Sequence, residues 1–219
     1  MESEGKRGLI IFDFDGTLVD LSIDWGNIRD GLATLLNDYG ISVRFGPGFT
    51  YRLFSSIDLL GKPDRDVLRG RADALYDAEE MGGIGQIKFK PGLFEMVDRY
   101  AKDYDLAISS NNGSKVITAV LQKAGISSHF RVVMSRNTAR LKPDPEPLVK
   151  IIKELGSTEA YMVGDLPTDI LAAKNAQRLV RARIKTIGIT GPSEGSTFSG
   201  VKPDFLIRGI GELGTVIKP

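Results

Sequence analysis

The chain has 219 residues, of which 42% are hydrophobic, and it carries 29 basic and 28 acidic residues. This size suits one substantial domain, or a core domain with a smaller inserted one. A net charge of +1 argues against nucleic acid or an anionic membrane as the main partner. The chain has no cysteine and a single histidine, His129, so disulfides, thiolate metal sites and two-histidine metal sites are excluded.

No segment of the sequence predicts a leader peptide or a membrane anchor. The apolar run at residues 9–12 is too short for a signal-peptide core, and Asp13 interrupts it. No apolar run approaches the ~20 residues that a membrane-spanning helix needs. We therefore expect a soluble, cytoplasmic protein that is either a monomer or a homodimer.

The first predicted strand ends in two acidic residues. Residues 9–12 are apolar and indicate a short buried strand, after which come Asp13, Asp15, Gly16 and Thr17. Side chains alternate faces along an extended chain, so Asp13 and Asp15 are expected to project to the same side. Two neighbouring carboxylates in an apolar setting repel each other, and they persist where a cation or a shared proton relieves them.

Polar residues also follow a second short predicted strand, at residues 106–108. Ser110 and Asn111 are the candidate binding residues at its end, and Ser109 is an alternative one residue earlier. The same segment also fits an ordinary strand-to-helix turn, in which Ser114 or Asn112 caps the next helix.

The third candidate is Lys142, which stands in the segment Leu-Lys-Pro-Asp-Pro. Pro143 and Pro145 restrict the backbone around this lysine and open the following helix at a defined angle. The alternative is a solvent-facing lysine before a helix that starts at a proline.

A fourth polar cluster follows the apolar residues 160–163, where Gly164 and Asp165 precede Asp169. If a helix begins near Pro167, Asp165 lies on the turn and Asp169 on the first helical turn, and both face the strand ends. The alternative is that one of these aspartates only caps the helix.

Strand-like runs alternate with helical patterns along most of the chain. The runs cover residues 9–12, 106–109, 131–134, 160–163, 186–189 and 205–207. Two amphipathic helical stripes lie between them and end at Gly125 and Gly156. This alternation predicts an α/β fold with a doubly wound, mostly parallel sheet and helices on both faces. Strand carboxyl ends meet at one edge of such a sheet, so the polar clusters are expected to lie together.

The interval from about residue 21 to residue 88 breaks the alternation and predicts helices instead. The first helix face consists of Ile28, Leu32, Leu35, Leu36 and Tyr39, and the second of Val67, Leu68, Ala72, Leu75 and Tyr76. We therefore expect residues 1–20 and 89–219 to form the α/β core and residues 21–88 to form a small helical insertion.

The four polar clusters together resemble the motifs of the haloacid dehalogenase-like hydrolase superfamily, which is dominated by magnesium-dependent phosphatases. The matching segments read DFDGTL, SSNN, LKPDP and GDLPTD. The resemblance implies the Rossmann-like core of that superfamily. The interval at residues 21–88 resembles the helical cap of its phosphoglycolate phosphatase type, which implies that this insertion selects the substrate.

The resemblance also implies a role for each site residue. Asp13 becomes the nucleophile that accepts a phosphoryl group, Asp15 the general acid and base, and Lys142 the cation that offsets negative charge. The phosphate-binding residues implied are Gly16, Thr17, Ser110 and Asn111. The implied cofactor is Mg²⁺, held by Asp13, by the backbone carbonyl of Asp15 and by Asp165, with Asp169 either a further ligand or a support.

The activity that follows from the resemblance is hydrolysis of a small phosphorylated metabolite, phosphoglycolate or a sugar phosphate, through an aspartyl phosphate. The alternatives are a phosphomutase of the same superfamily and a non-catalytic binding protein with the same fold. Trp25 is expected in the core of the cap, and His129 on the surface or in a turn. Six basic residues of the interval either reach the substrate or remain solvated: Arg29, Arg44, Arg52, Lys62, Arg65 and Arg69.

Overall fold

A computed structural model describes residues 8–42, 44–46, 48–191, 198 and 200–218. The chain divides into two compact units, one made of residues 1–20 and 88–219 and the other of residues 21–87. Among the described residues, no helix combines the length and the apolar character that crossing a bilayer requires.

The larger unit is built on a six-stranded sheet in which every pair of neighbouring strands is parallel. Its strands are β1 (Gly8–Phe12), β4 (Tyr104–Ser109), β5 (Phe130–Met134), β6 (Glu159–Gly164), β7 (Arg183–Ile189) and β8 (Phe205–Ile207). Their order across the sheet is β5-β4-β1-β6-β7-β8, so the chain winds outward from β1 in both directions. The predicted doubly wound α/β fold is confirmed, and all six predicted strands are present.

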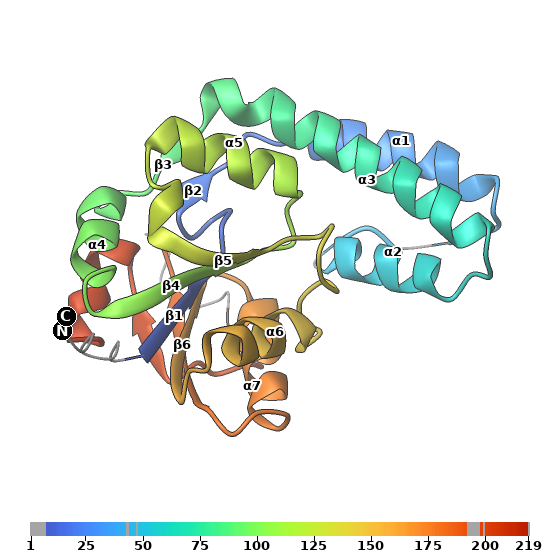
Figure 1. Cartoon of the computed structure of the whole chain (residues 1–219). Helices are drawn as coiled ribbons and strands as arrows, with labels where there is room; N and C mark the ends of the chain where they lie inside the picture. The colour runs from blue at the N-terminus through green and yellow to red at the C-terminus, as the bar shows by residue number, and fades with distance from the viewer. Residues whose placement is uncertain (1–7, 43, 47, 192–197, 199, 219) are drawn as a thin grey trace. The chain divides into compact units, whose positions relative to one another are not determined.

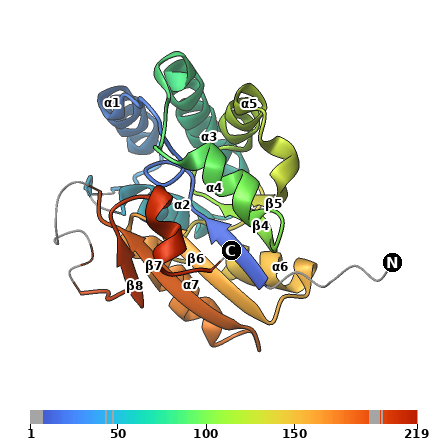
Figure 2. The ribbon, with the colours of Figure 1, turned by 90° about the vertical axis from the view of Figure 1, so that its left-hand side faces the viewer.

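Helices cover both faces of this sheet (Figures 1 and 2). They are α4 (Leu93–Tyr100), α5 (Ser114–Ala124), α6 (Glu146–Leu155) and α7 (Pro167–Gln177), with short 3₁₀ turns η2 (Ser127–His129) and η3 (Ile210–Thr215). In Figure 2, α4 and α5 lie on one face of the sheet, and α6 and α7 lie on the other. Helices α5 and α6 end as predicted at Gly125 and Gly156, whose φ angles of 70° and 61° suit a residue without a side chain.

Strand β1 lies in the middle of the sheet and is fully buried from Leu9 to Phe12, because helices cover both of its faces. Leu9 and Ile11 belong to the apolar cluster that packs under α6 and α7. Asp13 continues the same alternation of side chains, which directs it toward the side of the sheet where α6 and α7 begin. The strand therefore determines which helices can supply partners to this carboxylate.

The smaller unit is helical, with α1 (Trp25–Asn37), α2 (Phe49–Asp58), α3 (Asp64–Gly82) and the 3₁₀ turn η1 (Gly83–Gln86). Helices α1 and α2 both pack on α3. Both predicted helices are present, but α2 was not expected. Its buried stripe, Phe49, Leu53, Phe54 and Ile57, spans only ten residues and begins directly after Gly48, which has φ 72°.

Two expected core residues of the smaller unit are exposed. Val67 is 50% exposed, because Leu68, Ala72 and Tyr76 repeat at every fourth residue and occupy the buried stripe of α3. Trp25 is 55% exposed, so the prediction that it lies in the core was wrong. It is the first residue of α1 and meets only the edge of this core, with its ring centroid 6.5 Å from that of Tyr76.

Several of the basic residues in the smaller unit pair with acids close by. Arg69 donates to Asp58 at 2.8 Å, and Arg65 lies 3.3 Å from Asp66. These pairs are partly or largely solvent-exposed, so each contributes little to stability.

Two short strands, β2 (Val19–Asp20) and β3 (Lys88–Phe89), pair antiparallel where the chain leaves the larger unit and returns to it. Asp20 pairs with Lys88 in this ladder and also accepts an ion pair from Lys90 at 2.6 Å. Lys88 therefore belongs to the larger unit, one residue before the boundary expected from the sequence. A two-residue strand has no periodicity that the sequence could reveal.

Replacing Ile151 by alanine tests the packing of α6 on the sheet. This side chain is fully buried in the cluster that includes Leu9 and Ile11. We expect Ile151→Ala to lower the free energy of unfolding by about 3 kcal/mol, because it leaves a cavity. The exposed Glu154 on the same helix supplies a control, Glu154→Ala, expected within about 0.5 kcal/mol of wild type in urea denaturation. Equal stability of the two variants would contradict this packing.

Candidate active site

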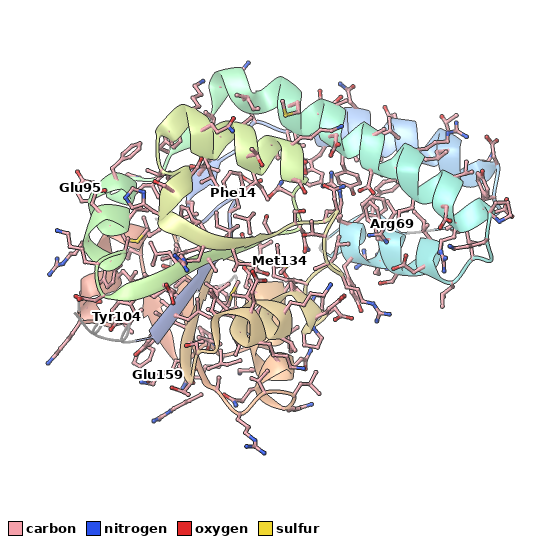
Figure 3. The ribbon with its side chains drawn as sticks, in the orientation of Figure 1. Phe14, Arg69, Glu95, Tyr104, Met134 and Glu159 are labelled. Carbon is pink, nitrogen blue, oxygen red and sulfur yellow. The ribbon has the colours of Figure 1, made fainter. Side chains whose placement is uncertain are left out.

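The sequence-predicted residues come together at the carboxyl ends of the central strands. Asp13 follows β1, Ser110 and Asn111 follow β4, and Asp165 follows β6. Figure 3 labels Tyr104 and Glu159 at the starts of β4 and β6, and Met134 at the opposite end of the sheet, where β5 ends. Lys142 reaches this same edge from the loop between β5 and α6, as the right-handed α/β winding requires.

The ammonium group of Lys142 is shared between two carboxylates. Its Nζ lies 2.6 Å from Oδ1 of Asp13 and 2.6 Å from Oδ1 of Asp169. All three side chains are buried, with 3%, 8% and 1% of their surfaces exposed. Burial alone lowers the pKa of Lys142, but the two carboxylates outweigh this effect and raise its pKa above the usual range. The lysine is therefore a fixed positive charge.

The three aspartates of the cluster are crowded by burial and by one another. Burial raises the pKa of Asp13, although the Lys142 ammonium opposes the shift. Burial, with the Asp169 carboxylate adding to it, raises the pKa of Asp165 to about 6. Burial also raises the pKa of Asp169 to about 6, against the attraction of Lys142. One lysine does not neutralise three carboxylates, so this site favours an additional positive charge or a proton.

Two glycines leave room for these carboxylates. A side chain on Gly16 would collide with the Asp165 carboxylate, and the φ angle of 88° at Gly16 also disfavours any other residue. A side chain on Gly164 would collide with the Asp169 carboxylate. Both glycines are therefore needed for the close approach of the acidic groups.

Asp165 and Asp169 are each held by a second contact. The Thr17 hydroxyl donates to Oδ1 of Asp165 at 3.1 Å, and the backbone N–H of Leu166 donates to Oδ2 of Asp169 at 3.0 Å. Thr17 thus orients Asp165, which lies far along the chain. The segment DFDGTL, which contains Thr17, does not reveal this role by itself. Asp15 is half-buried and its backbone bridges to Val19 in the turn after β1.

The two candidate serines differ in their surroundings. The Ser110 hydroxyl donates to Oδ1 of Asn112 at 2.8 Å and accepts from the Asn112 backbone N–H at 3.1 Å. The Ser109 hydroxyl is fully buried and has no hydrogen-bond partner among the described residues. Ser110 stands beyond the end of β4, whereas Ser109 is its last residue, so Ser110 remains the stronger candidate for phosphate binding.

Asn111 and Asn175 bond to the backbone beside Lys142, and Arg136 bonds to Asn111; of these three residues, only Asn111 stood out in the sequence. Oδ1 of Asn111 accepts from the Lys142 backbone N–H, and Nδ2 of Asn111 donates to the Lys142 carbonyl. Asn175 on α7 donates to the Pro143 carbonyl at 3.3 Å, and Arg136 donates to the Asn111 carbonyl at 3.1 Å. Neither Asn175 nor Arg136 belongs to a recognisable pattern, so the sequence gives no signal for them.

The acidic cluster suits a hard divalent cation. Asp13, Asp165 and Asp169 each offer an oxygen atom, and these atoms all lie within 4.8 Å of one another. Opposite ligands of Mg²⁺ are at most about 4.2 Å apart. The spacing therefore fits an ion that meets some of these carboxylates directly and others through water. The all-oxygen donor set and the space that Gly16 and Gly164 leave both agree with this chemistry.

His129 belongs to a different region. It lies in η2, and its Nε2 is 3.3 Å from a carboxylate oxygen of Asp98 on α4. This position in a partly exposed turn agrees with the sequence analysis.

Replacing Gly164 by alanine tests how closely Asp169 approaches β6. We expect Gly164→Ala to lower the free energy of unfolding by about 1–3 kcal/mol, because the added methyl group forces the buried carboxylate to move. Gly70 is a matched control, because it is helical and has open space around its Cα. Gly70→Ala is expected to raise the free energy of unfolding by about 0.5–1 kcal/mol. If Gly164→Ala were equally stabilising, the close approach would be refuted.

Comparisons with known proteins agree with this geometry. The sequence-family model described as "Haloacid dehalogenase-like hydrolase" matches residues 59–182. A phosphoglycolate phosphatase of Vibrio vulnificus is 30% identical, with 95% of each chain covered. One of Vibrio cholerae is also 30% identical, over 95% of this chain and 96% of that protein. A superfamily hydrolase of Geobacter sulfurreducens shares the fold, with TM-score 0.60 and 20% identity over 96% of this chain and 99% of the other. The chain therefore belongs to the haloacid dehalogenase-like hydrolase family.

Proposed function

We propose that the chain is a Mg²⁺-dependent phosphatase that hydrolyses a small phosphorylated metabolite through a phosphoryl group carried on Asp13. The observation that carries this proposal is the buried constellation of one lysine among three aspartates. Lys142 contacts Asp13 and Asp169 at 2.6 Å each, and Asp165 completes an acidic cluster at the same sheet edge. Membership of a hydrolase family and relatives named as phosphatases support the same activity.

In the first step, a carboxylate oxygen of Asp13 attacks the phosphorus atom, and the bond from phosphorus to the ester oxygen breaks. The carboxyl group of Asp15 protonates the departing alcohol. In the second step, water attacks the acyl phosphate while Asp15 takes its proton, and inorganic phosphate leaves with Asp13 restored. Gly16, between Asp15 and Thr17, lets the backbone approach the phosphate closely.

Positive charge and hydrogen-bond donors then hold the transferring group. Lys142 places its ammonium against the nucleophile, where negative charge accumulates as the phosphoryl group arrives. Ser110 stands at the end of the neighbouring strand, where its hydroxyl would turn from Oδ1 of Asn112 to donate to a phosphate oxygen. Phosphate binding by Gly16, Thr17 and Asn111 stays a prediction from the resemblance.

Asp13 and Asp165, with the backbone carbonyl of Asp15, are the proposed ligands of Mg²⁺. Bound there, the ion supplies charge neutralisation on the phosphoryl oxygens. Asp169 fits a supporting role better than that of a ligand, because Lys142 and the Leu166 N–H already engage its two oxygens. It holds the lysine in place and adds negative charge beside Asp165.

Phosphoglycolate is the first substrate to test, because the relatives that match over almost the whole chain are named phosphoglycolate phosphatases. We propose that residues 21–87 form the cap that selects the ester, and that the enzyme works in the cytoplasm. A panel of small phosphate esters, with and without Mg²⁺, would establish the preferred substrate.

The decisive variant for the mechanism is Asp13→Asn. Asparagine has the same shape but cannot form the acyl phosphate, so phosphate release from p-nitrophenyl phosphate should fall by about 10³-fold or more. Circular dichroism should show an intact fold. Asp103→Asn, in the turn after α4, removes a carboxylate away from the cluster and should retain full activity. Undiminished turnover of Asp13→Asn would reject the assignment of the nucleophile.

Stabilisation by Mg²⁺ should increase between pH 5 and pH 7. The pKa values of Asp165 and Asp169 in the folded state, about 6, lie above the ordinary value of 3.8. Protons therefore stabilise the metal-free fold below about pH 4, and this stabilisation is lost as the pH rises through about 6. Mg²⁺ competes with those protons, so the rise in melting temperature that it causes should be small at pH 5 and reach a plateau above pH 7.

The control for this measurement is Asp165→Asn, which removes a proposed ligand. Its melting temperature should respond little to Mg²⁺ at any pH. A Mg²⁺ effect of equal size at pH 5 and pH 7 in the wild-type protein would contradict the proposed competition with protons.

A further inference from the structure

Lys142 has a long, flexible side chain, so the place of its ammonium depends on how its backbone is held. The lysine stands in a loop between β5 and α6, outside any helix or strand. Its Nζ must nevertheless stay 2.6 Å from both Asp13 and Asp169. A small shift of the backbone would move the charge away from the nucleophile, and such misplacement is costly for catalysis.

Asn111 holds this backbone by two hydrogen bonds. The Lys142 backbone N–H donates to Oδ1 of Asn111 at 2.8 Å, and Nδ2 of Asn111 donates to the Lys142 carbonyl at 3.2 Å. A carboxamide offers one acceptor and one donor side by side, as a neighbouring strand would. We call this pair of hydrogen bonds the Asn111 clasp. It satisfies both polar backbone groups of the lysine.

The two sides of the clasp are themselves fixed. Nη1 of Arg136 donates to the Asn111 carbonyl at 3.1 Å, and the Arg136 backbone N–H donates to the Asn112 carbonyl at 3.0 Å. Asn175 donates to the Pro143 carbonyl from α7, the helix that also carries Asp169. The loop of Lys142 is thus tied to the end of β4 and to α7.

We propose that Asn111 is a positioning residue that acts on phosphate through Lys142, by fixing the backbone from which the ammonium extends. This inference rests on the proposed function, in which Lys142 meets the phosphoryl group. In place of the direct phosphate contact that the resemblance implies, it gives the Asn111 side chain the task of holding Lys142, because Oδ1 and one N–H of Nδ2 bond to the backbone of that residue.

A double-mutant cycle on the binding of inorganic phosphate in the presence of Mg²⁺ tests the proposal. Calorimetry would give the dissociation constant for wild type, Asn111→Ala, Lys142→Met and the double variant. We expect each single variant to bind phosphate at least about tenfold more weakly, the scale of one hydrogen bond to a charged group. The double variant should bind no more weakly than Lys142→Met alone, because without the ammonium the clasp has nothing to position.

Two results would overturn the proposal. If Asn111→Ala caused its full loss again in the Lys142→Met background, Asn111 would act on phosphate independently of the lysine. If folded Asn111→Ala bound phosphate like wild type, the clasp would be irrelevant to the site. Unchanged phosphate binding by Lys142→Met would be a different failure, because it would reject the proposed function of the lysine whatever Asn111 does.

Two further variants separate positioning from stability. Asn111→Asp is nearly isosteric and keeps the acceptor for the Lys142 N–H, but it cannot donate to the Lys142 carbonyl. It should show the same non-additive loss of phosphate binding, and it replaces Asn111→Ala if that variant does not fold. Asn137→Ala is the matched control, because this side chain accepts from the Ser114 N–H at 2.8 Å at the start of α5. It should lower the melting temperature and leave phosphate binding unchanged.

Discussion

The shared ion pair of Lys142 with Asp13 and Asp169 is the interaction on which the rest of the site depends. It joins three segments that are far apart in the sequence: the end of β1, the loop before α6 and the first turn of α7. Buried charges are tolerated only when they are paired, and here one cation faces an excess of carboxylates. The remaining negative charge favours a further positive charge or a proton at this edge of the sheet.

The fold supplies this arrangement through the order of its strands. Because β1 lies between β4 and β6, the segments that follow all three strands meet around one point. The alternation along β1 directs Asp13 toward α6 and α7, and the lysine and Asp169 come from the segments that lead into those helices. The chemistry and the architecture therefore have a common cause in the parallel, doubly wound sheet.

Much of this could be predicted from the sequence, for identifiable reasons. The strands of the sheet are short apolar runs, and helices α5 and α6 end at glycines, so local patterns were sufficient. Asp13 and Asp165 stand out because they closely follow apolar strands, and Lys142 because it directly precedes Pro143 in the segment LKPDP. Side-chain contacts between residues far apart in the sequence could not be predicted from local patterns. The hydrogen bond from Thr17 to Asp165 and the Asn111 clasp depend on side-chain geometry that no spacing encodes.

The smaller unit shows the opposite balance. Its helices were visible as apolar stripes, but Trp25 proved exposed and α2 was unexpected. An apolar stripe identifies the buried face of a helix. It does not show whether a residue at the end of the helix is also buried.

The paired strands β2 and β3 bring the entry and exit of residues 21–87 side by side within a single ladder. The two ends of the inserted segment are thus held together by strands of the larger unit. The described residues of the inserted segment contribute no strand to the central sheet. A segment of another length could therefore take the place of residues 21–87 without changing the strand order of the central sheet.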